Sequence, residues 1–184
     1  SGVSIPGTAN GSLPDKTMHY VPFTYAGTVD AYKLTSEMAT TEEYAQQNEY
    51  AHSLFVADYA VTHAVSWDNL NAEKLIFGKD YATGSVDYTL RAPSGESGGT
   101  GSGALERGTP QSNEWDRILD KDDGYIKNWR DIGSWGQDTL PNTLSNRVIR
   151  GRYDLPRKYA GANTTLSFPF LGFRPVLEVL NPDT

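Results

Sequence analysis

RVIRGRYDLPRKYAGANTTLSFPFLGFRPVLEVL, residues 147–180, is the stretch of the sequence that decides the fold. Its first five residues, 147–151, alternate charged and apolar side chains and end in glycine, which predicts a short strand. Residues 172–180 are mostly apolar and rich in β-formers, so we expect one buried strand that closes the domain. The residues between these two blocks follow neither a strand nor a helix period.

This aperiodic segment, residues 152–170, is rich in tyrosine, asparagine, serine, threonine and phenylalanine. One interpretation is a plain surface loop, since polar and turn-forming residues are common there. The other is a recognition surface, because tyrosine and small polar side chains provide contact area and hydrogen bonds at low entropic cost. A structureless segment of this length is usually functional or disordered, and its aromatic residues argue against disorder.

Composition and charge limit the classes of function. The chain has 184 residues, a formal net charge of −7 and no cysteine. The length suits a single compact domain with a substantial core. Because no basic field would offset phosphate repulsion, we expect no nucleic-acid partner. The sequence has no apolar run of transmembrane length, so we also expect no membrane insertion. The lack of cysteine excludes disulfides, thiolate metal sites and cysteine nucleophiles.

The rest of the chain shows short strands interspersed with short helices. Residues 1–18, with several glycines and two prolines, predict an extended N-terminal arm, and residues 93–111 predict a flexible Gly/Ser-rich loop. Pro22 places the first strand at the edge or start of a sheet. Strands are expected within 19–27, 29–34, 53–65 and 81–91, helices at 40–48, 66–78 (capped by Ser66) and 112–120, and a turn-rich region at 120–146. This order predicts an α+β fold without a βαβ repeat.

No set of side chains in the sequence assembles into a catalytic or metal site. The acidic turn at 120–124 lacks EF-hand spacing, and the acidic pair Glu114 and Asp116 is expected to be solvated surface charge. The histidines do not occur at ligand spacing, so we expect them in the core or on the surface rather than on zinc; they are His19, His52 and His63. The tryptophans expected in the core are Trp67, Trp115 and Trp135.

Four motifs together carry a resemblance to a known family. They are NEWDRI at 113–118, NWRDIGSWGQD at 128–138, RVIRG at 147–151 and GFRPVLE at 172–178, and the stretch 53–80 adds to them. With these motifs the chain resembles the variable proteins of diversity-generating retroelements over residues 20–180. The resemblance implies a C-type lectin fold, of the subgroup related to formylglycine-generating enzymes, for residues 19–184. Those enzymes use a cysteine-bound copper, and that chemistry is excluded in a chain without cysteine.

The resemblance also implies a function and a site. It implies a non-catalytic protein of receptor-recognition or adhesion type, on a virion or cell surface, whose segment 152–170 is diversified by mutagenic reverse transcription at adenines. The ligand would be a protein or a glycan, with no cofactor and no metal, and residues 130 and 131 would border the face. The contact residues implied are Tyr153, Asp154, Lys158, Tyr159, Asn163, Thr165, Ser167, Phe168 and Phe170. The alternatives are a lectin-like carbohydrate-binding module of fixed specificity and an enzyme, which would need an acid, a base or a metal site.

Overall fold

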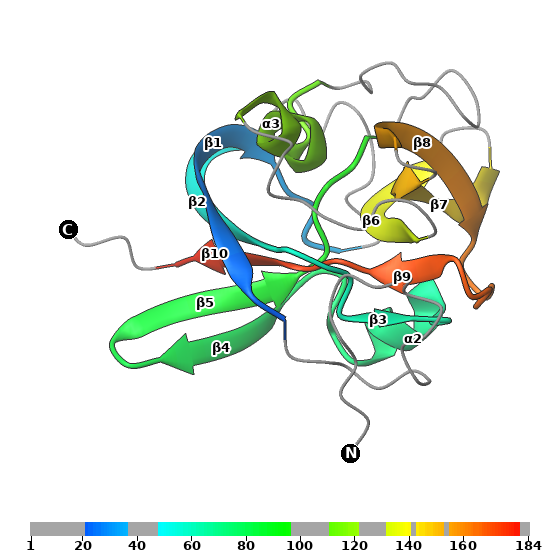
Figure 1. The fold of residues 1–184 in the computed structure, drawn as a ribbon, viewed down its shortest axis with the longest axis horizontal. Helices are drawn as coiled ribbons and strands as arrows, with labels where there is room; N and C mark the ends of the chain where they lie inside the picture. Colours follow the sequence, from blue (N-terminus) through cyan, green and yellow to red (C-terminus); the bar gives the residue numbers. More distant parts are fainter. Residues whose placement is uncertain are drawn as a thin grey trace.

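The computed structural model describes residues 21–36, 48–96, 111–121, 132–140, 143–152 and 155–180. In these residues the chain is mostly β-strand, arranged in two five-stranded sheets, with short helices beside them (Figure 1). The predicted α+β class therefore holds in its coarse form. The arm expected at 1–18 and the helix expected at 40–48 lie outside the described residues, apart from residue 48. No helix in the described part of the chain is both long and apolar enough to span a membrane.

The first sheet has the strand order β1-β2-β10-β5-β4, and all its neighbours are antiparallel. Its strands are β1 (Phe23–Tyr32), β2 (Glu49–Ala57), β10 (Val176–Val179), β5 (Val86–Arg91) and β4 (Lys79–Thr83). Pro22 directly precedes the edge strand β1, as the sequence predicts. The two short strands expected at 19–34 are one strand, because Gly27, at φ 84, lies at a bulge that bends β1 without ending it.

The second sheet has the order β3-β9-β6-β7-β8. Its strands are β3 (Thr62–His63), β9 (Leu171–Phe173), β6 (Gly133–Leu140), β7 (Thr143–Arg152) and β8 (Leu155–Asn163). The pair β6–β9 is parallel and the others are antiparallel. The strand predicted at 147–151 is confirmed as part of β7.

Three expected strands are divided in the structure. The single strands expected at 172–180 and 53–65 each contribute to both sheets, because the chain crosses between the sheets at Arg174–Pro175 and again after Ala57. Pro175 has no N–H to donate to a ladder, which favours a break there. The strand expected at 81–91 is a hairpin, β4–β5, whose turn contains Gly84 at φ 63.

Two strands were not expected. Residues 133–140, predicted as part of a turn-rich region, form β6, because its glycines allow close packing: a Cβ on Gly136 would lie 2.5 Å from Val148 Cγ1. Residues 155–163, predicted as aperiodic loop, form β8 at the outer edge of the second sheet. An edge position tolerates Pro156, since one side of the strand needs no ladder partner.

The helices follow their capping signals. Helix α2 (Trp67–Ala72) starts at Ser66, whose hydroxyl accepts from Asn69 N at 3.0 Å, although it ends at Ala72 and not at Gly78. Helix α3 (Glu114–Lys121) begins two residues after the expected start at residue 112, because Asn113 Oδ1 accepts from Asp116 N at 2.9 Å and caps the helix.

The core has two main parts. The larger contains Trp67 and Trp135 together with residues from both sheets, and the smaller lies where α3 packs on β1 and β2 through Trp115 (Figure 1). All three expected core tryptophans are thus confirmed as buried. The start of the loop predicted to be flexible, residues 93–96, is buried as well, and the rest of that loop up to residue 110 lies outside the described residues.

Candidate ligand-binding face

The strand before the predicted variable segment is a buried scaffold. Val148 and Ile149 lie in the core, but Arg147 and Arg150 are buried too, at 7% and 1% exposure. The Arg147 guanidinium lies 4.5 Å from the centre of the Trp67 ring and donates to the Leu144 carbonyl at 2.8 Å. These buried contacts of Arg147 therefore help to hold β7 in the scaffold.

The stretch after the segment is also scaffold. Residues 171–176 are buried, and Arg174 donates to the Ala57 carbonyl at 2.9 Å, which ties the crossing point to β2. A Cβ on Gly172 would lie 2.4 Å from Ile132 Cγ2 and 2.9 Å from the Thr62 carbonyl oxygen. Only glycine lets β9 approach its neighbours this closely.

The turn that follows β8 is held by hydrogen bonds at its base. Thr164 N donates to the Ser145 carbonyl at 3.2 Å, and the Thr164 carbonyl accepts from Asp68 N at 3.1 Å. Asn163 Oδ1 accepts from both the N–H and the hydroxyl of Thr165, at 3.0 and 2.8 Å. Asn163, implied as a ligand contact, thus uses its amide oxygen to shape the turn.

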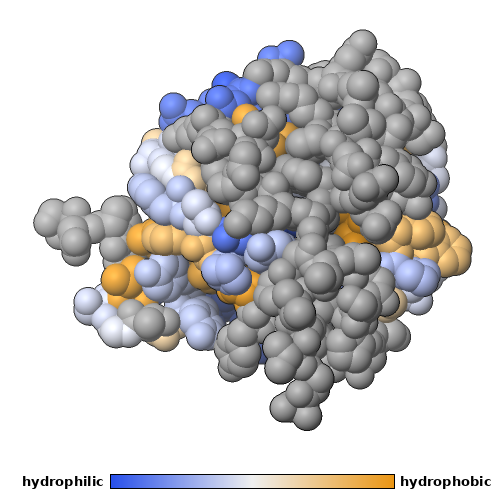
Figure 2. Space-filling model, viewed as in Figure 1, coloured by the Kyte–Doolittle hydropathy of each residue, from blue (hydrophilic) through white to orange (hydrophobic). Residues whose placement is uncertain are grey.

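The tip of this turn presents exposed side chains. Thr165, Ser167 and Phe168 are exposed, and Phe168 retains 48% of its surface. The Phe168 ring lies 5.3 Å from the ring of Phe170, which is half-buried and packs against the larger core. Figure 2 shows apolar surface at the right-hand edge of the molecule, near β9 and the chain that precedes it.

A buried histidine supports the same turn. His63 Nδ1 lies 3.1 Å from the Pro169 carbonyl oxygen, which can only accept, so this nitrogen carries the proton. His63 and His52 are both 6% exposed and hydrogen-bonded, which confirms the expectation of satisfied histidines for these two. His19 lies outside the described residues.

The structure describes only some of the remaining implied contact residues. Lys158 and Tyr159 lie on the backbone of β8, where Tyr159 is opposite Arg150. Tyr153 and Asp154 lie outside the described residues, as do residues 130 and 131 that were expected to border the face.

Leu144, which was not among the predicted contact residues, is 75% exposed at the start of β7, next to the Ser145 carbonyl that accepts from Thr164 N. A lone leucine at a strand end carries no sequence signal for exposure.

The expectation that Glu114 and Asp116 are solvated is wrong. Both are 0% exposed. Glu114 accepts from Arg91 Nη1 at 2.6 Å and Nη2 at 2.8 Å, and its Oε2 lies 2.6 Å from His52 Nε2. Burial alone would raise the pKa of Glu114, but the Arg91 charge and these hydrogen bonds outweigh it and hold the pKa at about 2. Glu178 extends the network by accepting from Arg91 Nη2 at 3.0 Å.

Asp116 belongs to a second buried network. Its Oδ1 accepts from Arg150 Nη2 at 2.7 Å, and Arg150 also faces Glu96 at 3.7 Å. Burial raises the pKa of Glu96 to about 8 against the opposing charge of Arg150, and Asp116 and Asp138 add to the rise. Asp138 accepts from the Tyr32 hydroxyl at 2.6 Å and from Gly95 N at 2.6 Å. Both networks join α3 to the sheets.

No group of three or more histidine, aspartate or glutamate side chains that could hold a metal ion occurs within the described residues. Comparisons of the chain with protein-family models, with curated proteins and with solved structures gave no match.

Proposed function

We propose that the protein is a non-catalytic ligand-binding protein of receptor-recognition or adhesion type. Its recognition face would comprise β8 and residues 164–170, diversified by a retroelement on a C-type lectin fold. The ligand would be a protein or a glycan, and the molecule would act on a virion surface or outside a cell. Two small sheets with short helices are compatible with that fold.

The observation that carries the proposal is a contrast in burial along one stretch of chain. Residues 147–150 and 171–176 are buried in the scaffold, whereas Thr165, Ser167 and Phe168 between them are exposed. Substitutions at exposed positions away from special contacts usually change the free energy of unfolding by less than about 0.5 kcal/mol. A surface of this kind can vary in sequence while the fold stays intact.

The buried charges favour binding over catalysis. A catalytic acid or base is expected in a cleft with a shifted pKa. Glu114, whose pKa is held at about 2, is fully buried and engaged with Arg91 and His52. These contacts join α3 to the first sheet, so they account for the shift without a substrate.

The first experiment is deep sequencing of the segment in its native population, together with a search for a near-identical template repeat nearby. We expect substitutions at adenine positions of the template to fall at exposed positions within 152–170, Thr165, Ser167 and Phe168 among them. Residues 147–151 and 172–178 should stay constant. An invariant segment would overturn diversification and favour a carbohydrate-binding module of fixed specificity.

A second experiment tests binding directly. Wild-type protein is screened on arrays of glycans and of purified cell-surface proteins, and any ligand found is titrated against Phe168→Ala. Tyr81→Ala is the matched control, because Tyr81 is a 55% exposed aromatic residue on β4, in the other sheet. We expect Phe168→Ala to weaken binding by roughly tenfold or more, in the range of an aromatic contact at an interface centre. Equal affinity of the two variants would contradict the proposed face.

A further inference from the structure

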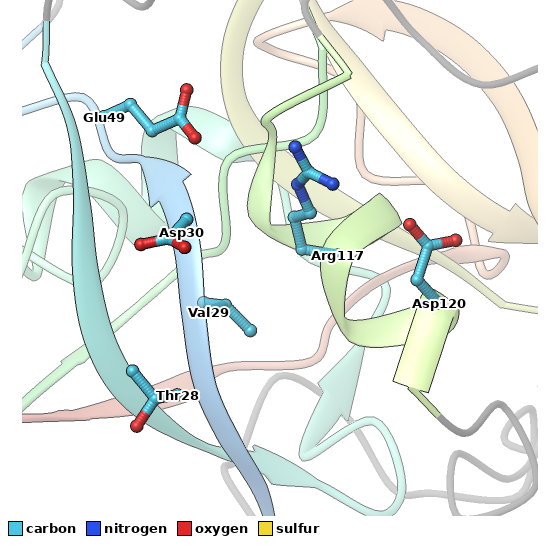
Figure 3. Close-up of a pocket in the computed structure, with 6 residues that line it drawn as sticks. All are labelled: Thr28, Val29, Asp30, Glu49, Arg117 and Asp120. Atoms are coloured by element: carbon cyan, nitrogen blue, oxygen red, sulfur yellow. The ribbon is translucent and has the colours of Figure 1, made fainter.

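A cavity of about 320 Å³ opens between β1, β2 and α3 (Figure 3). This volume lies at the lower end of the range for ligand pockets, roughly 300–1,000 Å³, so it suits a small molecule. The cavity involves neither β8 nor residues 164–170. Its lining residues are Thr28, Val29, Asp30, Glu49, Arg117 and Asp120.

Arg117 is the unusual member of this set. Its neighbours on the helix, Trp115 and Ile118, are packed in the core below β1, and this packing holds Arg117 at the rim. Within the described residues its guanidinium makes no hydrogen bond and no ion pair, and its Nε is buried without a partner. The Arg117 side chain as a whole is partly exposed, but its Nε–H is buried, and a ligand acceptor would remove the cost of leaving that N–H unpaired.

The other charges of the cavity are negative. Asp30 comes from β1, Glu49 from β2 and Asp120 from α3, and Figure 3 shows the Arg117 guanidinium between the carboxylates of Glu49 and Asp120. Because Asp120 is engaged in an interaction of its own, Asp30 and Glu49 against Arg117 leave a formal charge of −1 for a ligand to meet. If the lining charges only neutralised one another, the Arg117 guanidinium would form an ion pair with a lining carboxylate, but no such pair is present among the described residues.

This arrangement limits the chemistry of the ligand. A simple anion would meet Arg117 but would be repelled by three carboxylates, and a simple cation would be repelled by Arg117. A molecule with an ammonium group and a carboxylate satisfies both signs, and an additional ammonium group matches the excess negative charge. We propose that this cavity binds a small zwitterion of the α-amino acid class, with a basic side chain preferred.

The test uses the full chain and two probes that differ by one carboxylate, L-lysine and 1,5-diaminopentane. Affinities are measured by isothermal titration calorimetry, and NMR shifts locate the site. We expect Arg117→Gln to weaken lysine binding roughly tenfold, about 1.4 kcal/mol, since the ligand carboxylate loses its partner. The same substitution should leave 1,5-diaminopentane binding unchanged or stronger. Arg117→Lys, which retains the charge, should preserve part of the lysine affinity.

Asp30→Asn and Glu49→Gln should weaken the binding of both probes, because both probes contain ammonium groups. Asp80→Asn, at an exposed position on β4, is the control and should change neither affinity. Melting temperatures confirm that each variant is folded. The proposal is overturned if wild-type protein does not bind lysine at millimolar concentration. It is also overturned if Arg117→Gln affects both probes alike, or if a neutral sugar such as methyl mannoside shifts the same signals at the same concentration.

Discussion

Replacing Glu114 by Gln is expected to destabilise the protein strongly, because it removes the charge at the centre of the larger buried network. Glutamine keeps the shape of the side chain but leaves the Arg91 guanidinium with Glu178 as its remaining carboxylate partner. Breaking one side of a buried ion pair costs about 3–5 kcal/mol.

The pKa of Glu114 provides an independent magnitude. A shift from the ordinary 4.5 to about 2 in the folded protein corresponds to roughly 3 kcal/mol of stability at neutral pH. The two magnitudes agree, and for a chain of this length they predict a melting temperature lower by roughly 6–20 °C.

The assay is urea unfolding at neutral pH, followed by thermal melts at decreasing pH. Because the folded pKa of Glu114 is depressed, its contribution is present above 4.5 and is lost as the pH falls toward 2. Wild type should therefore lose more stability over this range than Glu114→Gln does. Asp80→Asn, at an exposed site, is the control and should match wild type.

A loss below about 1 kcal/mol at neutral pH, the value of an exposed ion pair, would refute the reasoning. So would an acid profile of Glu114→Gln that parallels wild type. Either result would mean that the network contributes no more than surface charge.

Two further predictions concern the candidate face and the second network. Phe170→Ala should lower the free energy of unfolding by about 2 kcal/mol, roughly half the cost at a fully buried phenylalanine, whereas Phe168→Ala should cost less than about 1 kcal/mol; equal losses in urea unfolding would contradict the different burial of the two rings. Because burial raises the pKa of Glu96 to about 8, the folded state retains its proton, and stability should fall as the pH rises from 4.5 through about 8. Glu96→Gln should flatten that decline in unfolding experiments, and an unchanged slope would exclude Glu96 as its source.

Elements with a strong local signal could be predicted from the sequence. Ser66 caps α2, Pro22 precedes an edge strand, residues 147–151 lie in a strand and Trp135 is buried. Each of these depends on neighbours in sequence or on side-chain size: a hydroxyl three residues before an N–H, a missing N–H, or a large apolar surface. The exposure expected for part of the segment 152–170 also followed from its composition.

The tertiary structure decided what depends on distant partners. The alternation of charged and apolar residues at 147–151 predicts a strand but not the partner of Arg150, which meets Asp116, 34 residues away, in the core. Glu114 meets His52 from 62 residues away. The division of 172–180 between two sheets and the pairing of β8 with β7 depend likewise on strands elsewhere in the chain. A hydrogen bond or ion pair between remote residues leaves no periodic mark in either segment. Local pattern therefore determined elements such as α2 and the strand at 147–151, whereas folding determined β6, β8, the partners of each strand and the cavity around Arg117.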